Sequence, residues 1–114
     1  MIYTKKDIEQ LDRVTRLKII NAATGIKPAN LIGSISDSKI TNLAIFSSVV
    51  HLGSNPALLG FISRPQTPEV GHTLRNIKEN GSYTINHIHP SFVKNAHYTS
   101  AKFTAEESEF ERCG

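Results

Sequence analysis

The sequence predicts a predominantly β domain, a barrel or a sandwich, with short helices at its edges. Apolar, β-prone runs recur with turn signals between them, most clearly over residues 42–51 and 57–64 on either side of a Gly-Ser-Asn-Pro turn. Strands and helices do not alternate regularly, which argues against a doubly wound parallel sheet. A chain of 114 residues can enclose one core, so we expect a single domain over residues 1–114.

Residues 1–25 are expected to be an N-terminal helical segment. Thr4 and Asp7 match a capping box at its start. Apolar residues then recur at helical spacing, namely Ile8, Leu11, Val14, Leu17, Ile20 and Ala23. Gly25 is expected just past the end of the helix, and Pro28 prevents its continuation. We interpret this segment as one helix that packs on the rest of the domain.

A meander of strands is expected next, followed by shorter elements. Residues 31–36 form a strand, and the turn 37–39 leads into the run that starts at Ile40. The remaining expected elements are a loop from Pro65 to Gly71, a helix over 73–79 closed by Asn80–Gly81, a strand over 83–89, and a helix over 92–97 capped by Ser91.

Charge and composition narrow the class of partner. The net charge is +3 with a sequence pI of about 9.2, and the thirteen Lys and Arg residues are spread along the chain. Nucleic-acid binding usually shows a stripe of such residues interleaved with aromatics, and none is present, so no nucleic-acid partner is expected. A small anionic ligand suits this charge equally well.

The chain has the composition of a cytoplasmic protein. Its single cysteine, Cys113, cannot form an intrachain disulfide, which favours a reducing compartment. The N-terminus lacks the apolar core of a signal peptide. No run approaches the roughly 18 apolar residues of a membrane span, so no membrane partner is expected.

The C-terminal end does not resemble a finished element. Residues 106–114 are an acidic, helical or turn-like run that stops at a glycine, and Phe110 is the one candidate anchor in it. We therefore expect the chain to be the N-terminal portion of a longer domain, truncated at its C-terminus.

Three catalytic or metal-binding alternatives are weaker than a binding site. His87 and His89 would share one face of a strand, but no spaced cysteines and no His-Glu-x-x-His supply further metal ligands. No metal site is predicted. A Ser–His–acid triad from Ser47 or Ser48 with His51 or His72 lacks the Gly-x-Ser-x-Gly elbow. Cys113 is terminal and has no evident partner, so no catalytic side chain is predicted.

The remaining signal is a run of small hydroxyl and amide residues beside the central strands. Flavin mononucleotide (FMN) needs an apolar slot, hydrogen bonds to the polar ring edge, and donors for a phosphate. Ala44, Ile45 and Phe46 can wall the slot while their N–H groups reach the ring. Charged donors are the stronger phosphate partners; the candidate phosphate residues are Ser47, Ser48, Arg64 and Thr73. The alternative is that Ile45 and Phe46 are core residues and the serines only border a strand.

Five segments, in order, resemble the flavin reductase-like family, which includes flavoredoxins. They are NLAIFSS at 42–48, SNPALLGF at 54–61, HTLRNI at 72–77, YTINH at 83–87 and AHYTSAKF at 96–103. The resemblance runs from about Leu31 to the last residue. Two departures are the shorter length of this chain and the loop at 66–70.

The resemblance implies a mainly β, FMN-binding split β-barrel of the Greek-key type with short peripheral helices, incomplete in this chain. It also implies a homodimer that binds flavin near the subunit interface and uses a reduced nicotinamide, NAD(P)H, for hydride transfer to the flavin or for electron transfer through it. By this resemblance the isoalloxazine is lined by Asn42, Ala44, Ile45 and Phe46. The ribityl phosphate end is served by Ser47, Ser48, Ser63, Arg64, His72 and Thr73, and His97 lies close to the ring. The alternative is a non-enzymatic flavin-binding or interaction module.

Overall fold

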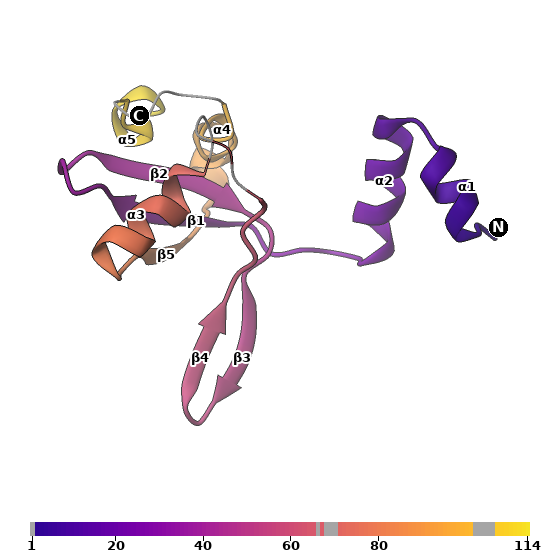
Figure 1. The fold of residues 1–114 in the computed structure, drawn as a ribbon. Helices are drawn as coiled ribbons and strands as arrows, with labels where there is room; N and C mark the ends of the chain where they lie inside the picture. Colours follow the sequence, from indigo (N-terminus) through magenta and orange to yellow (C-terminus); the bar gives the residue numbers. More distant parts are fainter. Residues whose placement is uncertain (1, 66, 68–70, 102–106) are drawn as a thin grey trace.

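Strand β1 (Asn30–Ile35) is the centre of the fold in the computed structural model, which describes residues 2–65, 67, 71–101 and 107–114. It pairs antiparallel with β2 (Thr41–Phe46) on one side and with β5 (Thr84–His87) on the other, in the order β2-β1-β5 (Figure 1). The turn into β2 is closed by Ser36 N–H donating to the Ile40 carbonyl at 2.9 Å, as the expected hairpin requires.

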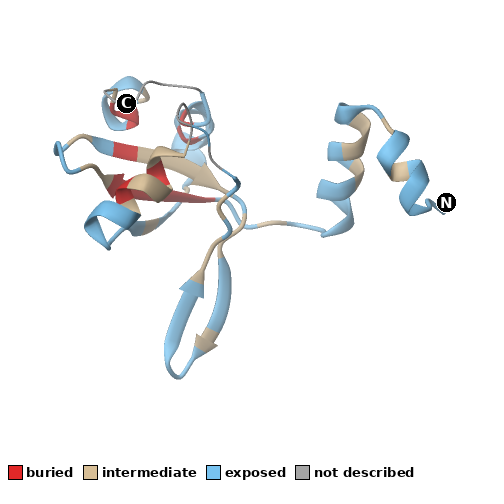
Figure 2. Ribbon diagram, in the orientation of Figure 1, coloured by how far each residue is buried: buried red, intermediate tan, exposed pale blue. Residues whose placement is uncertain are grey.

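Helix α3 (His72–Asn80) covers one face of this sheet (Figures 1 and 2). The Asn76 amide donates to Ser34 Oγ at 3.2 Å, so the helix lies on the face that carries the even-numbered side chains of β1. The helix ends at Gly81, whose φ of 73° is the left-handed conformation that glycine adopts most readily. The expected helix and its Asn80–Gly81 stop are both confirmed.

Residues 42–51 are divided between two sheets, and the expectation of one strand here is wrong. β2 ends at Phe46, which lies opposite Asn30, the first residue of β1. Beyond that point β1 offers no partner, because the chain before it contains Pro28, which has no N–H. The chain leaves the sheet and forms a separate hairpin, β3 (Val50–Ser54) and β4 (Ala57–Gly60), which projects from the sheet (Figure 1).

The N-terminal segment is two helices, α1 (Lys5–Gln10) and α2 (Arg13–Ala23), instead of one. The Thr4–Asp7 capping box is present, and Gly25 follows the second helix with a φ of 74°. The break occurs because the Asp12 carboxylate accepts from the N–H groups of Val14 and Thr15 and starts a new helix. Hydrogen bonds from Thr15, first from its side chain and then from its N–H, hold the pKa of Asp12 below its usual range.

Neither N-terminal helix packs on the sheet, contrary to expectation. No residue of α1 or α2 is buried, and Val14, Leu17 and Ile20 are 58%, 42% and 49% exposed. Figure 1 shows both helices beside the rest of the molecule, joined to β1 by an extended segment. The apolar periodicity of this segment therefore makes a face with no partner in the described part of the chain.

The C-terminal part adds three short helices, η1 (Pro90–Phe92), α4 (Val93–Tyr98) and α5 (Glu109–Arg112). His89, and not Ser91, caps the first of them, because the His89 ring accepts from Ser91 N–H at 3.2 Å. The anchor of the last helix is also different from the expected one. Phe110 is 50% exposed, while Ser108 and Glu109 are 7% and 5% exposed.

The expected fold class needs correction from mainly β to mixed. Helix accounts for 38% and strand for 24% of the described residues. The three-stranded and two-stranded sheets are both open at their edges, so the barrel is incomplete. Short local helix signals, such as the Asp12 cap before the first strand and the Gly81 stop between β4 and β5, account for the extra helix. In the described part of the chain, no helix combines the length and apolar content that a bilayer crossing requires.

Ile32 is the centre of the small apolar core, and its substitution tests how much this core contributes to stability. Its side chain is 0% exposed, between β2 and β5. We expect Ile32→Ala to lower the free energy of unfolding by about 2 to 5 kcal/mol, because it removes buried methyl groups and leaves a cavity. Urea denaturation followed by circular dichroism measures this change. Ile26→Ala, at a fully exposed position, is the control and should have almost no effect.

Candidate functional site

The predicted site residues lie in four parts of the structure. Asn42, Ala44, Ile45 and Phe46 are on β2. Ser47, Ser48, Ser63 and Arg64 lie in the two segments that join the sheet to the hairpin, residues 47–49 and 61–64, which we call the neck. His72 and Thr73 begin α3, and His97 is on α4. The expected family departure at 66–70 lies outside the described residues except for Thr67.

Strand β2 has one free edge, and this edge determines which main-chain groups can reach a ligand. Leu43 N–H donates to the Glu109 carboxylate at 2.9 Å and so points away from β1. Main-chain groups alternate in direction along an antiparallel strand, so Ile45 N–H also faces the free edge. Those of Ala44 and Phe46 face β1. The three consecutive N–H groups expected at a flavin ring are therefore reduced to one, at Ile45.

Asn42 and Thr73 contact each other and are joined by Glu109, which sequence reasoning missed. In the amide orientation that satisfies all three groups, Thr73 Oγ1 donates to the Asn42 carbonyl at 2.9 Å and Asn42 Nδ2 donates to the two Glu109 oxygens, each at 3.3 Å. We call this the Glu109–Asn42–Thr73 network. All three side chains are buried. The Thr73 hydroxyl proton is thereby engaged within the protein.

The neck is held together by one serine. Ser48 Oγ donates to the Ile62 carbonyl at 2.9 Å and accepts from Ile62 N–H at 3.2 Å. This contact continues the hairpin register, in which Val50 lies opposite Gly60, so Ser47 and Ser63 come next along the two segments. The side chains of Ser47 and Arg64 are exposed and make no hydrogen bond or ion pair with any residue that the structure describes.

Three aromatic rings pack beneath the neck. The Phe46 and Phe61 ring centroids are 4.9 Å apart at 66°, and those of Phe61 and Tyr83 are 5.3 Å apart at 80°. Such edge-to-face pairs are favourable beyond their buried area. Phe46 is therefore partly a packing residue, which was the alternative to a flavin contact, but its side chain remains only half-buried.

The first turn of α3 is an open set of donors. Its cap, Gly71, has a φ of 89° and supplies no side-chain hydrogen bond. The first N–H groups of a helix have no acceptor within it, and the helix dipole makes them attractive to anions. These groups belong to His72, Thr73 and the residues that follow.

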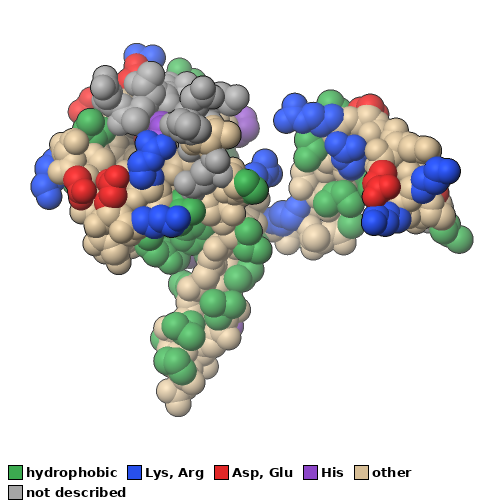
Figure 3. Space-filling view, viewed as in Figure 1, with side chains coloured by type: hydrophobic (Ala, Val, Ile, Leu, Met, Phe, Trp, Pro, Cys, Tyr) green, Lys and Arg blue, Asp and Glu red, His purple; other side chains and the backbone are tan. Residues whose placement is uncertain are grey.

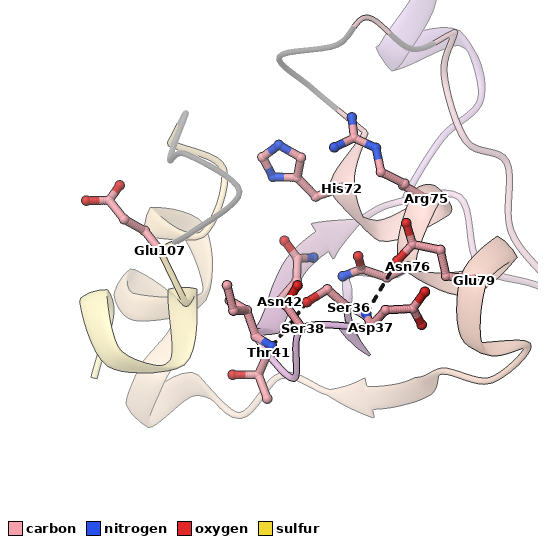
Figure 4. A pocket seen from close by; sticks show the side chains of 11 residues that line it. Ser36, Asp37, Ser38, Thr41, Asn42, His72, Arg75, Asn76, Glu79 and Glu107 are labelled. Atoms are coloured by element: carbon pink, nitrogen blue, oxygen red, sulfur yellow. Dashed lines mark hydrogen bonds between the residues drawn. The ribbon is translucent and has the colours of Figure 1, made fainter.

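A polar cavity of about 240 Å³ lies between this helix and the β1–β2 turn (Figure 4). Asn42 and His72 are the two predicted residues that line it. In this cavity the main-chain N–H of Asp37 donates to the Glu79 carboxylate at 3.4 Å. A second cavity, of about 310 Å³, lies on the other face of the sheet beside Gly33, Tyr83 and Phe110, and none of the predicted residues lines it.

The metal and thiol alternatives find no support in the geometry. His89 Nδ1 lies 2.8 Å from Ser91 Oγ and is engaged in capping. Within the described residues, no three His, Cys, Asp or Glu side chains group as metal ligands would. Burial and the nearby Glu109 carboxylate raise the pKa of the Cys113 thiol, which disfavours a reactive thiolate.

Comparison with known protein families identifies the family of this chain. The profile of the flavin reductase like domain matches residues 26–114, which is more than half of the chain and begins just after α2. The chain therefore belongs to the flavin reductase-like domain family. A search of curated proteins found no match.

Solved structures show the same fold. A protein from Shewanella frigidimarina NCIMB 400, assigned as a flavin reductase with a split barrel domain, is 48% identical with a TM-score of 0.89 over 98% of this chain and 55% of its own. Nitrilotriacetate monooxygenase component B from Bacillus cereus is 21% identical, with a TM-score of 0.85 over 99% of this chain and 55% of its own. The 2-nitrobenzoate 2-nitroreductase NbaA from Pseudomonas fluorescens is 22% identical, with a TM-score of 0.77 over 100% of this chain and 52% of its own. This chain spans about half the length of each, so it contains part of a split barrel.

The Glu109–Asn42–Thr73 network predicts a stability effect. Glu109→Ala leaves Leu43 N–H and the Asn42 amide without an acceptor, so we expect the free energy of unfolding to fall by about 1 to 3 kcal/mol. Chemical denaturation measures this loss. Glu111→Ala, at an exposed position of the same helix, should change it by less than about 0.5 kcal/mol. Equal effects of the two substitutions would contradict the assignment.

Proposed function

We propose that this chain is the FMN-binding part of a cytoplasmic, homodimeric oxidoreductase that uses NAD(P)H. The observation that carries the proposal is a set of donors with no acceptor in the described part of the chain. They are the Ile45 N–H on the free edge of β2, the Ser47 hydroxyl and the Arg64 guanidinium at the neck. Family membership supports a flavin as the ligand that these donors meet.

The residues present fit the chemistry of FMN. Ala44, Ile45 and Phe46 are half-buried, so they leave apolar surface for a flat ring. Ile45 N–H can donate to the polar edge of that ring. Arg64 is charged and Ser47 has a hydroxyl, which together suit a dianionic phosphate, and the uncapped first turn of α3 adds main-chain donors. Among the predicted phosphate residues, Ser48, Ser63 and Thr73 already use their hydroxyls within the protein.

The bound flavin would supply the redox chemistry, accepting a hydride from a nicotinamide or relaying electrons. The side chains of this chain bind and orient. Main-chain donors at the polar ring edge would stabilise the negative charge that develops there on reduction. His97, on α4, is exposed and is proposed to lie beside the ring.

The dimer is proposed because large apolar side chains on the hairpin have no partner in the described part of the chain. Leu52, Leu58 and Leu59 are 63%, 50% and 55% exposed, and Figure 3 shows hydrophobic side chains on the visible surface of the hairpin. Exposed apolar clusters of this kind usually mark interaction surfaces. A second subunit at the hairpin would cover them.

The test is a titration of the purified chain with FMN, followed by anaerobic addition of NADH or NADPH. Binding with a shifted flavin absorption band and bleaching by either nicotinamide supports the oxidoreductase. Binding with a colour that persists indicates a flavin-binding module without a nicotinamide site. A spectrum of FMN that the protein leaves unchanged would refute the proposal.

Arg64 and Ser47 are expected to distinguish FMN from riboflavin, which has no phosphate. We expect Arg64→Ala to weaken FMN about 10- to 100-fold, the usual worth of a charged hydrogen bond, and to leave riboflavin nearly unchanged. Fluorescence quenching of each flavin gives the two dissociation constants. Ser47→Ala should act in the same direction but less strongly. Arg13→Ala removes the same charge from α2, outside the family match, and serves as the control.

A further inference from the structure

Glu109 is an acidic residue whose side chain is buried, although acidic side chains usually lie in solvent. It is 5% exposed, and it accepts hydrogen bonds from Leu43 N–H at 2.9 Å and from Asn42 Nδ2 at 3.3 Å. Burying a carboxylate is costly unless hydrogen bonds compensate it, and here these two donors both come from β2. The contact therefore fixes α5 to the free edge of this strand.

Asn42 extends this contact to α3. Only one orientation of its amide lets the nitrogen donate to Glu109 and the oxygen accept from Thr73 Oγ1 at 2.9 Å. Glu109 thus decides which way the amide points, and the amide decides that the Thr73 hydroxyl donates. Asn42 and Thr73 are 8% and 6% exposed, so water cannot easily replace either partner.

Thr73 is the second residue of α3 and holds its first turn against β2. The later part of the helix is fastened separately, by Asn76 to Ser34 at 3.2 Å and by Asn80 to the Ile35 carbonyl at 2.6 Å. Gly71 gives the first turn no side-chain cap. The direction of the first N–H groups therefore depends on the Thr73 contact.

We propose that Glu109 is a positioning residue, which acts through Asn42 and Thr73 to place the first turn of α3 for the phosphate of FMN. This inference rests on the proposed function. It assigns α5 a role in selecting flavin mononucleotide over unphosphorylated flavin, although α5 need not touch either ligand.

Moving the negative charge of the network from position 109 to position 42 tests the proposal. Asn42→Asp places two carboxylates about 3.3 Å apart, which repel each other and displace α5 or Thr73. Adding Glu109→Gln restores every hydrogen bond in reverse. The new glutamine amide donates to the new aspartate, the glutamine oxygen accepts from Leu43 N–H, and Thr73 still donates to position 42. The double variant also keeps the net charge of the wild type.

Dissociation constants of FMN and riboflavin are measured for the wild type, N42D, E109Q and N42D/E109Q. We expect N42D to weaken FMN about tenfold more than riboflavin, and the double variant to recover the wild-type ratio within about threefold, as for a directly coupled pair. The proposal would be overturned if the double variant kept the same loss of FMN relative to riboflavin as N42D. That result would mean that the carboxylate introduced at position 42 repels the phosphate directly. An unchanged ratio in N42D would also overturn it. E111Q on the same helix is the matched control.

A second measurement does not need a flavin. Amide hydrogen exchange of the ligand-free chain should be faster in N42D at Arg75, whose N–H closes the first turn onto the Gly71 carbonyl, and normal again in the double variant. Gly81, whose N–H donates to the Ile77 carbonyl at the other end of the helix, should change little. Unchanged exchange at the first turn overturns the proposal even if FMN binds. A wild type that fails to bind FMN but shows this exchange pattern refutes the proposed function and leaves the coupling of α5 to α3 standing. If N42D does not fold, recovery of folding by the double variant supports the coupling, and an unfolded double variant overturns it.

Discussion

Hydrogen bonding between buried polar groups is the constraint on which this structure depends. Among the described residues, eight polar side chains are buried but only three apolar ones, Leu31, Ile32 and Ala96. So small an apolar core contributes modestly, and each buried polar group would be destabilising if left unpaired. All buried side-chain nitrogen and oxygen atoms in the described part of the chain have a partner. The packing of α3 and α5 on the sheet is therefore specified mainly by direction-dependent contacts, which tolerate little displacement.

Strand β2 carries both the architecture and the proposed ligand contacts. One edge pairs with β1 along its whole length, and the other contacts α5 and has no further strand beside it in the described part of the chain. Thr41 Oγ1 lies 2.7 Å from Ser108 Oγ, and Leu43 N–H donates to Glu109, so the helix occupies two successive outward positions. The N–H of Ile45, the next outward position, has no acceptor in the described part of the chain. The boundary between structural and ligand-binding roles thus falls between two residues of one strand.

Features set by neighbours in the sequence could be predicted, and features set by distant partners could not. The Thr4 capping box, the turn at 37–39 and the glycines after α2 and α3 follow from local backbone preferences. The end of β2 depends on where β1 begins, which no property of residues 42–51 reveals. Asp12 is a recognisable helix cap that apolar periodicity concealed. Family resemblance placed Asn42 at the flavin ring and Thr73 at the phosphate end and did not indicate that their side chains meet. The burial of Glu109 depends on Leu43, 66 residues away, and a run of acidic residues usually indicates a solvated surface.

The projecting hairpin is expected to open locally more easily than the rest of the molecule. Two strands without a third, or a helix to cover them, are marginally stable in water, so β3 and β4 depend on their attachment to the neck. Ser48 makes that attachment and is adjacent to Ser47. Breaking the Ser48 hydrogen bonds would therefore free the hairpin and also displace a proposed phosphate donor. Thermodynamic linkage makes this relation reciprocal. A nucleotide bound at the neck would restrain fluctuations of the hairpin and so increase its affinity for a second subunit. A second subunit bound at the hairpin would increase the affinity of the neck for the nucleotide by the same factor.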